Sequence, residues 1–127
     1  MDLSAVAAAL VANCRAGTER AALEELYAED AVSVEALDQG AGRETFGKAG
    51  ISAKHDWWDE NFEVHSGEVL GPFPHAATED APDRFAVIFR LSATFKPTGE
   101  RSDMEEIGLY TVADGKIVRE EFFYGPE

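Results

Sequence analysis

The sequence predicts an α+β domain in which three helices cover one face of a curved, mainly antiparallel sheet. Apolar residues recur every three or four positions in three segments that end before residue 62, as in helices packed on a core. Later segments alternate polar and apolar residues between turn signals, as in strands. Among those signals, Asp114-Gly115 is the strongest indication of a tight antiparallel hairpin. We expect a single domain over residues 1–127.

Two helices are predicted close to the N-terminus. Apolar residues return at helical spacing over residues 3–14, and Gly17 is positioned to end this helix. Thr18 can cap a second helix, whose inward stripe includes Leu23 and which we expect to end near Asp30.

A short strand, a loop and a third helix are expected next. Residues 32–36 alternate like a strand, and Gly40 and Gly42 mark the loop that follows. Residues 48–61 return to helical spacing, with Ile51 on the inward stripe.

Four strands are predicted in the rest of the chain, over residues 63–70, 84–95, 103–113 and 116–124. Gly71-Pro72 is expected to end the first of them. Neither face of the last hairpin is polar throughout, so both faces are expected to be covered, one by the helices and one by a second subunit. This pattern favours a homodimer through the sheet.

The register of the last hairpin follows if Asp114 and Gly115 form its two-residue loop. Val112 should then face Ile117, and Tyr110 should face Arg119. One face would carry both glutamates and the large apolar side chains of a pocket wall, namely Met104, Glu106, Tyr110, Glu121 and Phe123.

Composition narrows the classes of partner. The chain has 25 acidic and 11 basic residues, a net charge of −14, and 45% hydrophobic residues, which favours a folded domain over a disordered one. The negative charge disfavours nucleic acid and anionic membranes as partners. The one cysteine, Cys14, cannot form an internal disulfide, and neither a signal peptide nor a membrane-spanning stretch is recognised, so we expect a cytoplasmic protein.

Several motifs resemble the SnoaL-like branch of the nuclear transport factor 2-like superfamily, which includes ketosteroid isomerase. They are LYAEDAV at residues 26–32, HDWW at 55–58, EVHS at 63–66, YTVADGKIV at 110–118 and EFFY at 121–124. The resemblance implies a cone-shaped fold with an apolar pocket and places the chain among uncharacterised bacterial members. Relatives of this fold include isomerases, polyketide cyclases and dehydratases, so the resemblance identifies a fold better than an activity.

Matching the chain to ketosteroid isomerase places Glu35 about where that enzyme has its catalytic aspartate. A carboxylate in an apolar cone has a raised pKa, which suits proton abstraction beside a carbonyl. The alternative is a solvated Glu35 on a half-exposed strand. The isomerase also uses a tyrosine to stabilise the oxyanion, but the matching residue here is Leu10. Tyr27, Tyr110 or His65 could donate instead.

Glu106 and Glu121 form a second candidate site. Two carboxylates that are close together in a poorly solvated space cannot both ionise easily, so one would hold a proton and could act as an acid. The alternative is an ion-pair patch with Arg119, Arg90 or Lys116.

The histidines and tryptophans offer further candidates. His55, His65 and His75 match no metal-ligand spacing, so no metal is expected. His65 is a candidate pocket acid, base or donor, with an ordinary half-buried strand histidine as the alternative. We expect Trp58 to point inward, where it would close the pocket, and Trp57 to lie at a rim or a subunit contact. Simple core packing of both is the alternative.

These features predict a small-molecule-binding protein that acts as a cofactor-independent general acid/base enzyme of isomerase, cyclase or dehydratase type, on an apolar carbonyl-bearing or cyclic metabolite. The candidate catalytic residues are Glu35, His65, Tyr110, Glu106 and Glu121. The candidate ligand-binding residues are Tyr27, His55, Trp58, Met104 and Phe123. No glycine-rich phosphate-binding motif occurs, so no cofactor is expected. The alternative is a non-catalytic ligand-binding or protein-interaction module that uses the same dimeric cone.

Overall fold

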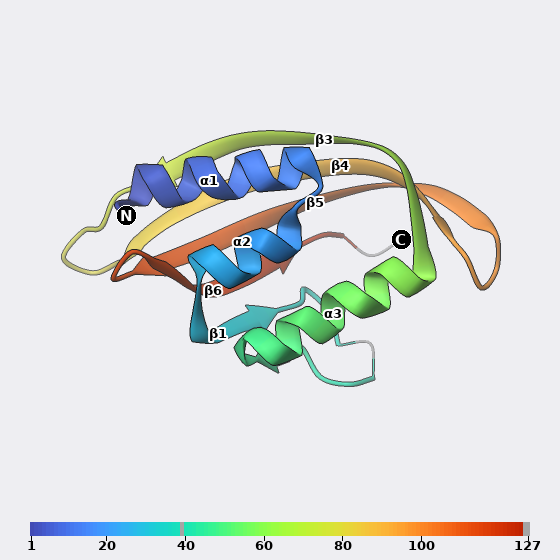
Figure 1. Ribbon diagram of the computed structural model, residues 1–127, viewed down its shortest axis with the longest axis horizontal. Coiled ribbons are helices and arrows are strands. Elements are labelled where there is room, and N and C mark those ends of the chain that lie inside the picture. The colour runs from blue at the N-terminus through green and yellow to red at the C-terminus, as the bar shows by residue number, and fades with distance from the viewer. Residues whose placement is uncertain (39, 126–127) are drawn as a thin grey trace.

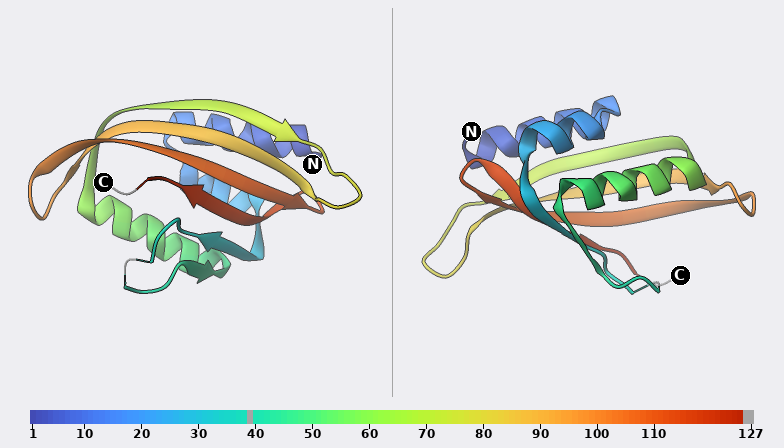
Figure 2. Two further views of the ribbon diagram at one scale, coloured as in Figure 1. Left: turned by 180° about the vertical axis from the view of Figure 1, so that it is seen from behind. Right: turned by 60° about the horizontal axis from the view of Figure 1, so that its bottom comes forward.

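A computed structural model describes residues 1–38 and 40–125. Its elements, in chain order, are α1 (Leu3–Ala16), α2 (Glu19–Leu26), β1 (Tyr27–Val34), β2 (Glu44–Phe46), α3 (Gly47–Asn61), β3 (Phe62–His75), β4 (Asp83–Phe95), β5 (Glu100–Ala113) and β6 (Lys116–Phe123). The three helices lie on one side of a curved six-stranded sheet, as Figures 1 and 2 show. The α+β prediction is confirmed.

The sheet has the strand order β2-β1-β6-β5-β4-β3. β1 runs parallel to β6, and the other neighbouring strands are antiparallel. Within the described part of the chain, no helix combines the length and apolar character that crossing a membrane requires.

The first helix ends as predicted. The Asp2 carboxylate accepts a hydrogen bond of 2.8 Å from the Ala5 amide and caps the first turn. Gly17 follows the last turn at φ 71°, a left-handed conformation that favours glycine. The buried residues of α1 are Val6, Ala7, Leu10 and Val11, and the helix packs over β3 and β4.

The boundary after α2 differs from the prediction. α2 ends at Leu26 rather than near Asp30, and β1 starts at once with Tyr27 rather than at residue 32. Tyr27 pairs with Ile117 of β6, so contacts with a strand far along the chain outweigh the local helical pattern. β2, which the sequence did not predict, is a short strand that pairs with β1.

β3 is also longer than predicted. It continues past Gly71-Pro72 to His75, with a shift in register between Leu70 and Phe73. Pairing with β4 resumes beyond this irregularity, so the expected turn is an interruption within one strand.

The hairpin between β5 and β6 corrects a central prediction. Val112 pairs with Ile117 as expected, but a β-bulge then shifts the register, and Tyr110 pairs with Glu120 instead of Arg119. One extra residue turns every later side chain of β6 to the opposite face. The predicted placement of Glu106 and Glu121 on one face is therefore wrong, and Glu120 takes the inward position.

The core lies between the helices and the inner face of β4, β5 and β6. Phe85 and Val87 of β4 are fully buried. The Tyr110 ring stacks on Phe85 with centroids 4.9 Å apart. The same ring extends over Gly108, where a Cβ atom would lie 2.8 Å from it. Gly108 therefore leaves the space that lets Tyr110 extend its hydroxyl along β5, in the direction of Glu106.

Candidate functional site

A buried carboxylate, Glu120, lies under the helices on the inner face of the sheet. It is 4% exposed and accepts hydrogen bonds from the Tyr27 hydroxyl and from the Ser33 hydroxyl, the latter at 2.6 Å. Tyr27 and Ser33 are also buried and come from β1, which pairs with β6 at this point. Two charge-assisted hydrogen bonds thus satisfy a carboxylate that would otherwise be costly to bury.

Lys54 of α3 links this buried group to Glu35. Its ammonium group donates to Ser33 Oγ at 2.7 Å and lies 2.5 Å from Glu35 Oε1. The Tyr124 hydroxyl donates to Glu35 Oε2 at 3.0 Å. One continuous network therefore runs from Tyr27 to Tyr124. We call this set, Tyr27, Glu120, Ser33, Lys54, Glu35 and Tyr124, the inner network.

Glu106 lies beside the inner network on β5. The pKa of its carboxyl is raised from 4.5 to about 7, chiefly by burial and also by the charges of Glu35 and Glu120, while the charge of Lys54 acts in the opposite direction. A carboxyl with a pKa of about 7 is present in both protonation states around neutral pH. It can therefore both accept and return a proton under ordinary conditions.

Two buried tyrosines stand near the same carboxylates. Burial, followed by the charge of Glu120, raises the pKa of Tyr27 and of Tyr110 well above 10.0. Both hydroxyls therefore keep their protons at neutral pH. That of Tyr27 is committed to Glu120, whereas that of Tyr110 extends along β5 toward Glu106.

A pocket of about 370 Å³ lies between α3 and the β4–β5 hairpin. Its lining residues are Trp57, Phe62, Phe95, Thr98, Glu100, Ser102 and Met104. Met104 is two positions from Glu106 on β5 and shares its face, so the pocket wall leads toward the inner network. Trp58 is not among the lining residues and stacks on Phe62 with centroids 4.2 Å apart.

The structure assembles part of the predicted site. Glu35, Tyr27, Tyr110 and Glu106 lie together at or beside the inner network. Met104 lines the neighbouring pocket, and His55 is half-buried on α3.

Other predicted residues lie elsewhere. His65 is exposed on β3, with Nε2 2.7 Å from the Thr94 hydroxyl. Glu121 is on the outer face, where its carboxylate is 3.4 Å from Arg119, and Phe123 is exposed on that face too. Among residues 1–38 and 40–125, no group of three or more His, Cys, Asp or Glu side chains could hold a metal ion.

Sequence reasoning missed Glu120, Lys54, Ser33 and Tyr124. Lys54 follows Ile51 by three positions on α3, so its helical spacing already placed it near the inward stripe. Glu120 had no such signal, because its orientation depends on the bulge in β6.

Comparison with known proteins identifies relatives of the whole fold. Residues 5–124 match the family model of the SnoaL-like domain. A Mesorhizobium loti protein named as a candidate SnoaL-like polyketide cyclase is 37% identical, with 98% of this chain and 100% of that chain covered and a TM-score of 0.86. None of the curated protein sequences matches the chain.

More distant solved structures share the fold alone. A Bacillus subtilis protein named as a candidate isomerase is 19% identical, with 99% of this chain and 91% of that chain covered and a TM-score of 0.76. A Catenulispora acidiphila protein with a ketosteroid isomerase-like fold, in complex with trimethylamine, is 20% identical, with coverages of 94% and 85% and a TM-score of 0.65. Given the match over residues 5–124 and the high identity to the Mesorhizobium loti protein, the chain belongs to the SnoaL-like domain family.

Proposed function

We propose that the protein is a cofactor-independent enzyme that moves a proton within an apolar carbonyl-bearing or cyclic small molecule, as isomerases, cyclases and dehydratases do. The observation that carries this proposal is Glu106, a carboxyl with a pKa of about 7 beside a buried polar network. The names of the Mesorhizobium loti cyclase and the Bacillus subtilis isomerase candidates are consistent with this class of reaction.

Glu106 is the proton-transferring residue in this proposal. Its carboxylate removes a proton from a carbon next to a carbonyl, and the resulting acid returns that proton to the same molecule at another carbon. The Tyr110 hydroxyl donates a hydrogen bond to the carbonyl oxygen as negative charge develops there. No other reactant is consumed, so an isomerisation of this kind is balanced.

Glu35 has a different role here from the base suggested by the family resemblance. Its carboxylate is bound on both oxygens, by Lys54 and by the Tyr124 hydroxyl. Because both oxygens already have partners within the protein, neither is free to approach a substrate carbon. We therefore assign Glu35 and Lys54 as positioning residues that set the charge around Glu106.

Hydrogen–deuterium exchange in a simple ketone tests the proposal without knowledge of the natural substrate. We expect the protein to accelerate deuterium incorporation beside the carbonyl of apolar cyclic ketones, starting with cyclohexanone, in D₂O followed by proton NMR. Glu106→Gln keeps the size but removes the acceptor, so exchange should fall by about 100-fold or more. The rate should rise with pH through about 7, as Glu106 ionises.

Glu63→Gln, an exposed carboxylate on β3, serves as the matched control and should keep the wild-type rate. Equal rates for Glu106→Gln and wild type would remove Glu106 from its role. Binding of the ketones with no exchange would favour a non-catalytic ligand-binding module instead.

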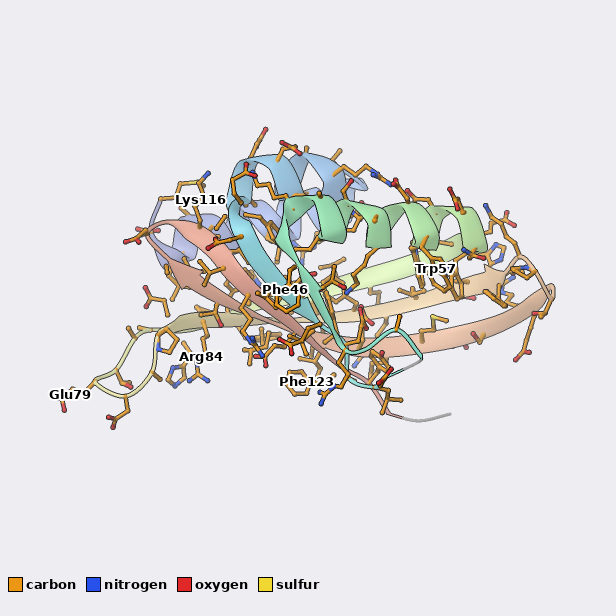
Figure 3. The ribbon with its side chains drawn as sticks, turned by 90° about the horizontal axis from the view of Figure 1, so that it is seen from below. Phe46, Trp57, Glu79, Arg84, Lys116 and Phe123 are labelled. Atoms are coloured by element: carbon orange, nitrogen blue, oxygen red, sulfur yellow. The ribbon has the colours of Figure 1, made fainter. Side chains whose placement is uncertain are left out.

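We also propose that the protein forms a homodimer through the outer face of the sheet. The apolar side chains Leu70, Ile88, Ile107 and Phe123 pair in a row across β3, β4, β5 and β6. Ile107 is 43% and Phe123 51% exposed, although the helices all lie on the other side. Figure 3 shows Phe123 and Arg84 both pointing away from the helices. A second copy would cover this row.

A buried polar atom of Arg84 also supports an interface on this face of the sheet. Its Nε atom is buried and lacks a hydrogen-bond partner within the described residues, beside a hollow of about 170 Å³ that it lines with Phe73 and Leu109. An acidic side chain from a second copy would satisfy this donor.

The oligomeric state can be measured by size-exclusion chromatography with light scattering. We expect wild type to have the mass of two 13.8-kDa chains and Ile107→Glu with Phe123→Glu to have the mass of one, with an unchanged circular dichroism spectrum. A monomeric wild type at the same concentration would contradict the proposal, and Glu63→Gln should remain dimeric.

A further inference from the structure

The pocket between α3 and the β4–β5 hairpin has an unusual lining that the proposed proton transfer does not explain. We call it the aromatic mouth. Three aromatic rings from three elements meet there: Trp57 of α3, Phe62 of β3 and Phe95 of β4. The Trp57 and Phe62 centroids are 5.9 Å apart with planes at 60°, and those of Phe62 and Phe95 are 5.2 Å apart at 44°. The tilted rings form a corner rather than a closed stack.

The aromatic mouth also carries negative charge. Glu100 is the one charged residue among its lining residues, which otherwise contribute two hydroxyls and the Met104 thioether. The nearby Lys96 ammonium group is bound to the Asp59 carbonyl oxygen at 3.0 Å, and Arg101 donates to Ser92 at 2.9 Å. The chain as a whole has a net charge of −14, which adds a field that attracts cations.

Trp57 supports a binding role as well. It is 52% exposed, a large indole at the edge of a pocket rather than in the core. Figure 3 shows it on the side of α3 near the extended hairpin, far from the loop that carries Glu79. An exposed tryptophan face beside a carboxylate is a favourable place for an organic cation, because the negative ring face attracts a positive charge that the apolar walls also help to bury.

We propose that the aromatic mouth binds an alkylammonium group, held by cation–π contacts with Trp57, Phe62 and Phe95 and by the charge of Glu100. The pocket of about 370 Å³ is large enough for a small ligand head group. Because Met104 connects the pocket to the face that carries Glu106, the rest of such a ligand can extend toward the inner network. This binding does not depend on whether Glu106 performs chemistry.

Choline and its neutral isostere 3,3-dimethylbutan-1-ol separate charge recognition from simple apolar filling. The chain has two tryptophans, so their indole N–H signals can be followed separately by NMR in a ¹⁵N-labelled sample. We expect choline to shift the Trp57 signal saturably at low salt. The affinity for the neutral isostere should be at least about tenfold lower than that for choline. The affinity should fall as salt is added.

Two variants test whether choline binds at the aromatic mouth. Glu100→Gln should weaken choline binding by about fivefold, as read from the Trp57 signal. Trp57→Leu should abolish binding, so that choline no longer shifts the Trp58 indole signal or the backbone amide signals of the neighbouring residues. The spectra of both variants without choline should show an intact fold. Glu79→Gln is the matched control, because it removes the same charge from a distant exposed loop and should leave the affinity unchanged. Equal binding of choline and its isostere, or equal losses in Glu100→Gln and Glu79→Gln, would overturn the proposal. Because no turnover is measured, a failed ketone-exchange test leaves this result interpretable.

Discussion

Between pH 4.5 and about 7, raising the pH should destabilise the wild-type protein relative to Glu106→Gln. The folded state raises the pKa of Glu106 from 4.5 to about 7, chiefly by burial. In this range the folded state holds more protons than the unfolded state, so raising the pH favours unfolding. The glutamine side chain stays neutral at every pH and pays no such penalty. At pH 8 the variant should therefore be more stable by about 3 kcal/mol, an upper value from a shift of this size.

Urea unfolding at pH 5, 6, 7 and 8 measures this difference. The gap between the two proteins should be small at pH 5, widen up to about pH 7 and then stay constant. Glu63→Gln removes an exposed carboxylate and should follow the wild-type curve within about 0.5 kcal/mol. If wild type and Glu106→Gln show parallel curves, the Glu106 carboxyl does not titrate near neutral pH, and the proposed base loses its main support.

Replacing Glu120 by alanine should destabilise the fold by about 3 kcal/mol. The substitution leaves the Tyr27 and Ser33 hydroxyls without their acceptor and opens a space in the core. Glu120→Gln keeps an acceptor of the same size, so it should cost much less. In both variants the negative charge of Glu120 is gone, so the pKa of Glu106 should fall below about 7.

Chemical denaturation measures the loss of stability in the Glu120 variants. A ¹³C NMR titration of the Glu106 carboxyl measures the change in its pKa. Glu121→Ala is the matched control, since this neighbouring glutamate lies on the outer face beside Arg119. It should change stability by less than about 1 kcal/mol. Equal costs for the alanine variants at 120 and 121 would mean that the bulge in β6 does not place Glu120 inside.

The inner network shows why local patterns identified only part of the candidate site. Glu35 and Tyr27 were found because they lie close to a motif that resembles a known family. Ser33, Lys54 and Glu120 come from β1, α3 and β6, and their hydrogen bonds form only when these elements pack together. The spacing of residues within one helix or strand does not indicate their hydrogen-bond partners on another element. The inner network was therefore not predictable from periodicity.

Elements whose signals are local could be predicted from the sequence. Helical spacing and Gly17 defined α1, and Asp114-Gly115 defined the β5–β6 turn, because capping, glycine conformation and turn geometry depend on neighbouring residues. The fold was needed to establish where α2 gives way to β1 and which glutamate of β6 faces inward. The boundary and the orientation both depend on pairing with strands far along the chain. In β6, one extra residue in the bulge turns the following side chains to the opposite face of the sheet, and the alternation of polar and apolar residues does not reveal it. The raised pKa of Glu106 could not be predicted from the sequence for the same reason. It arises from burial and from charged residues just after β1, on α3 and on β6 that the fold brings close to Glu106.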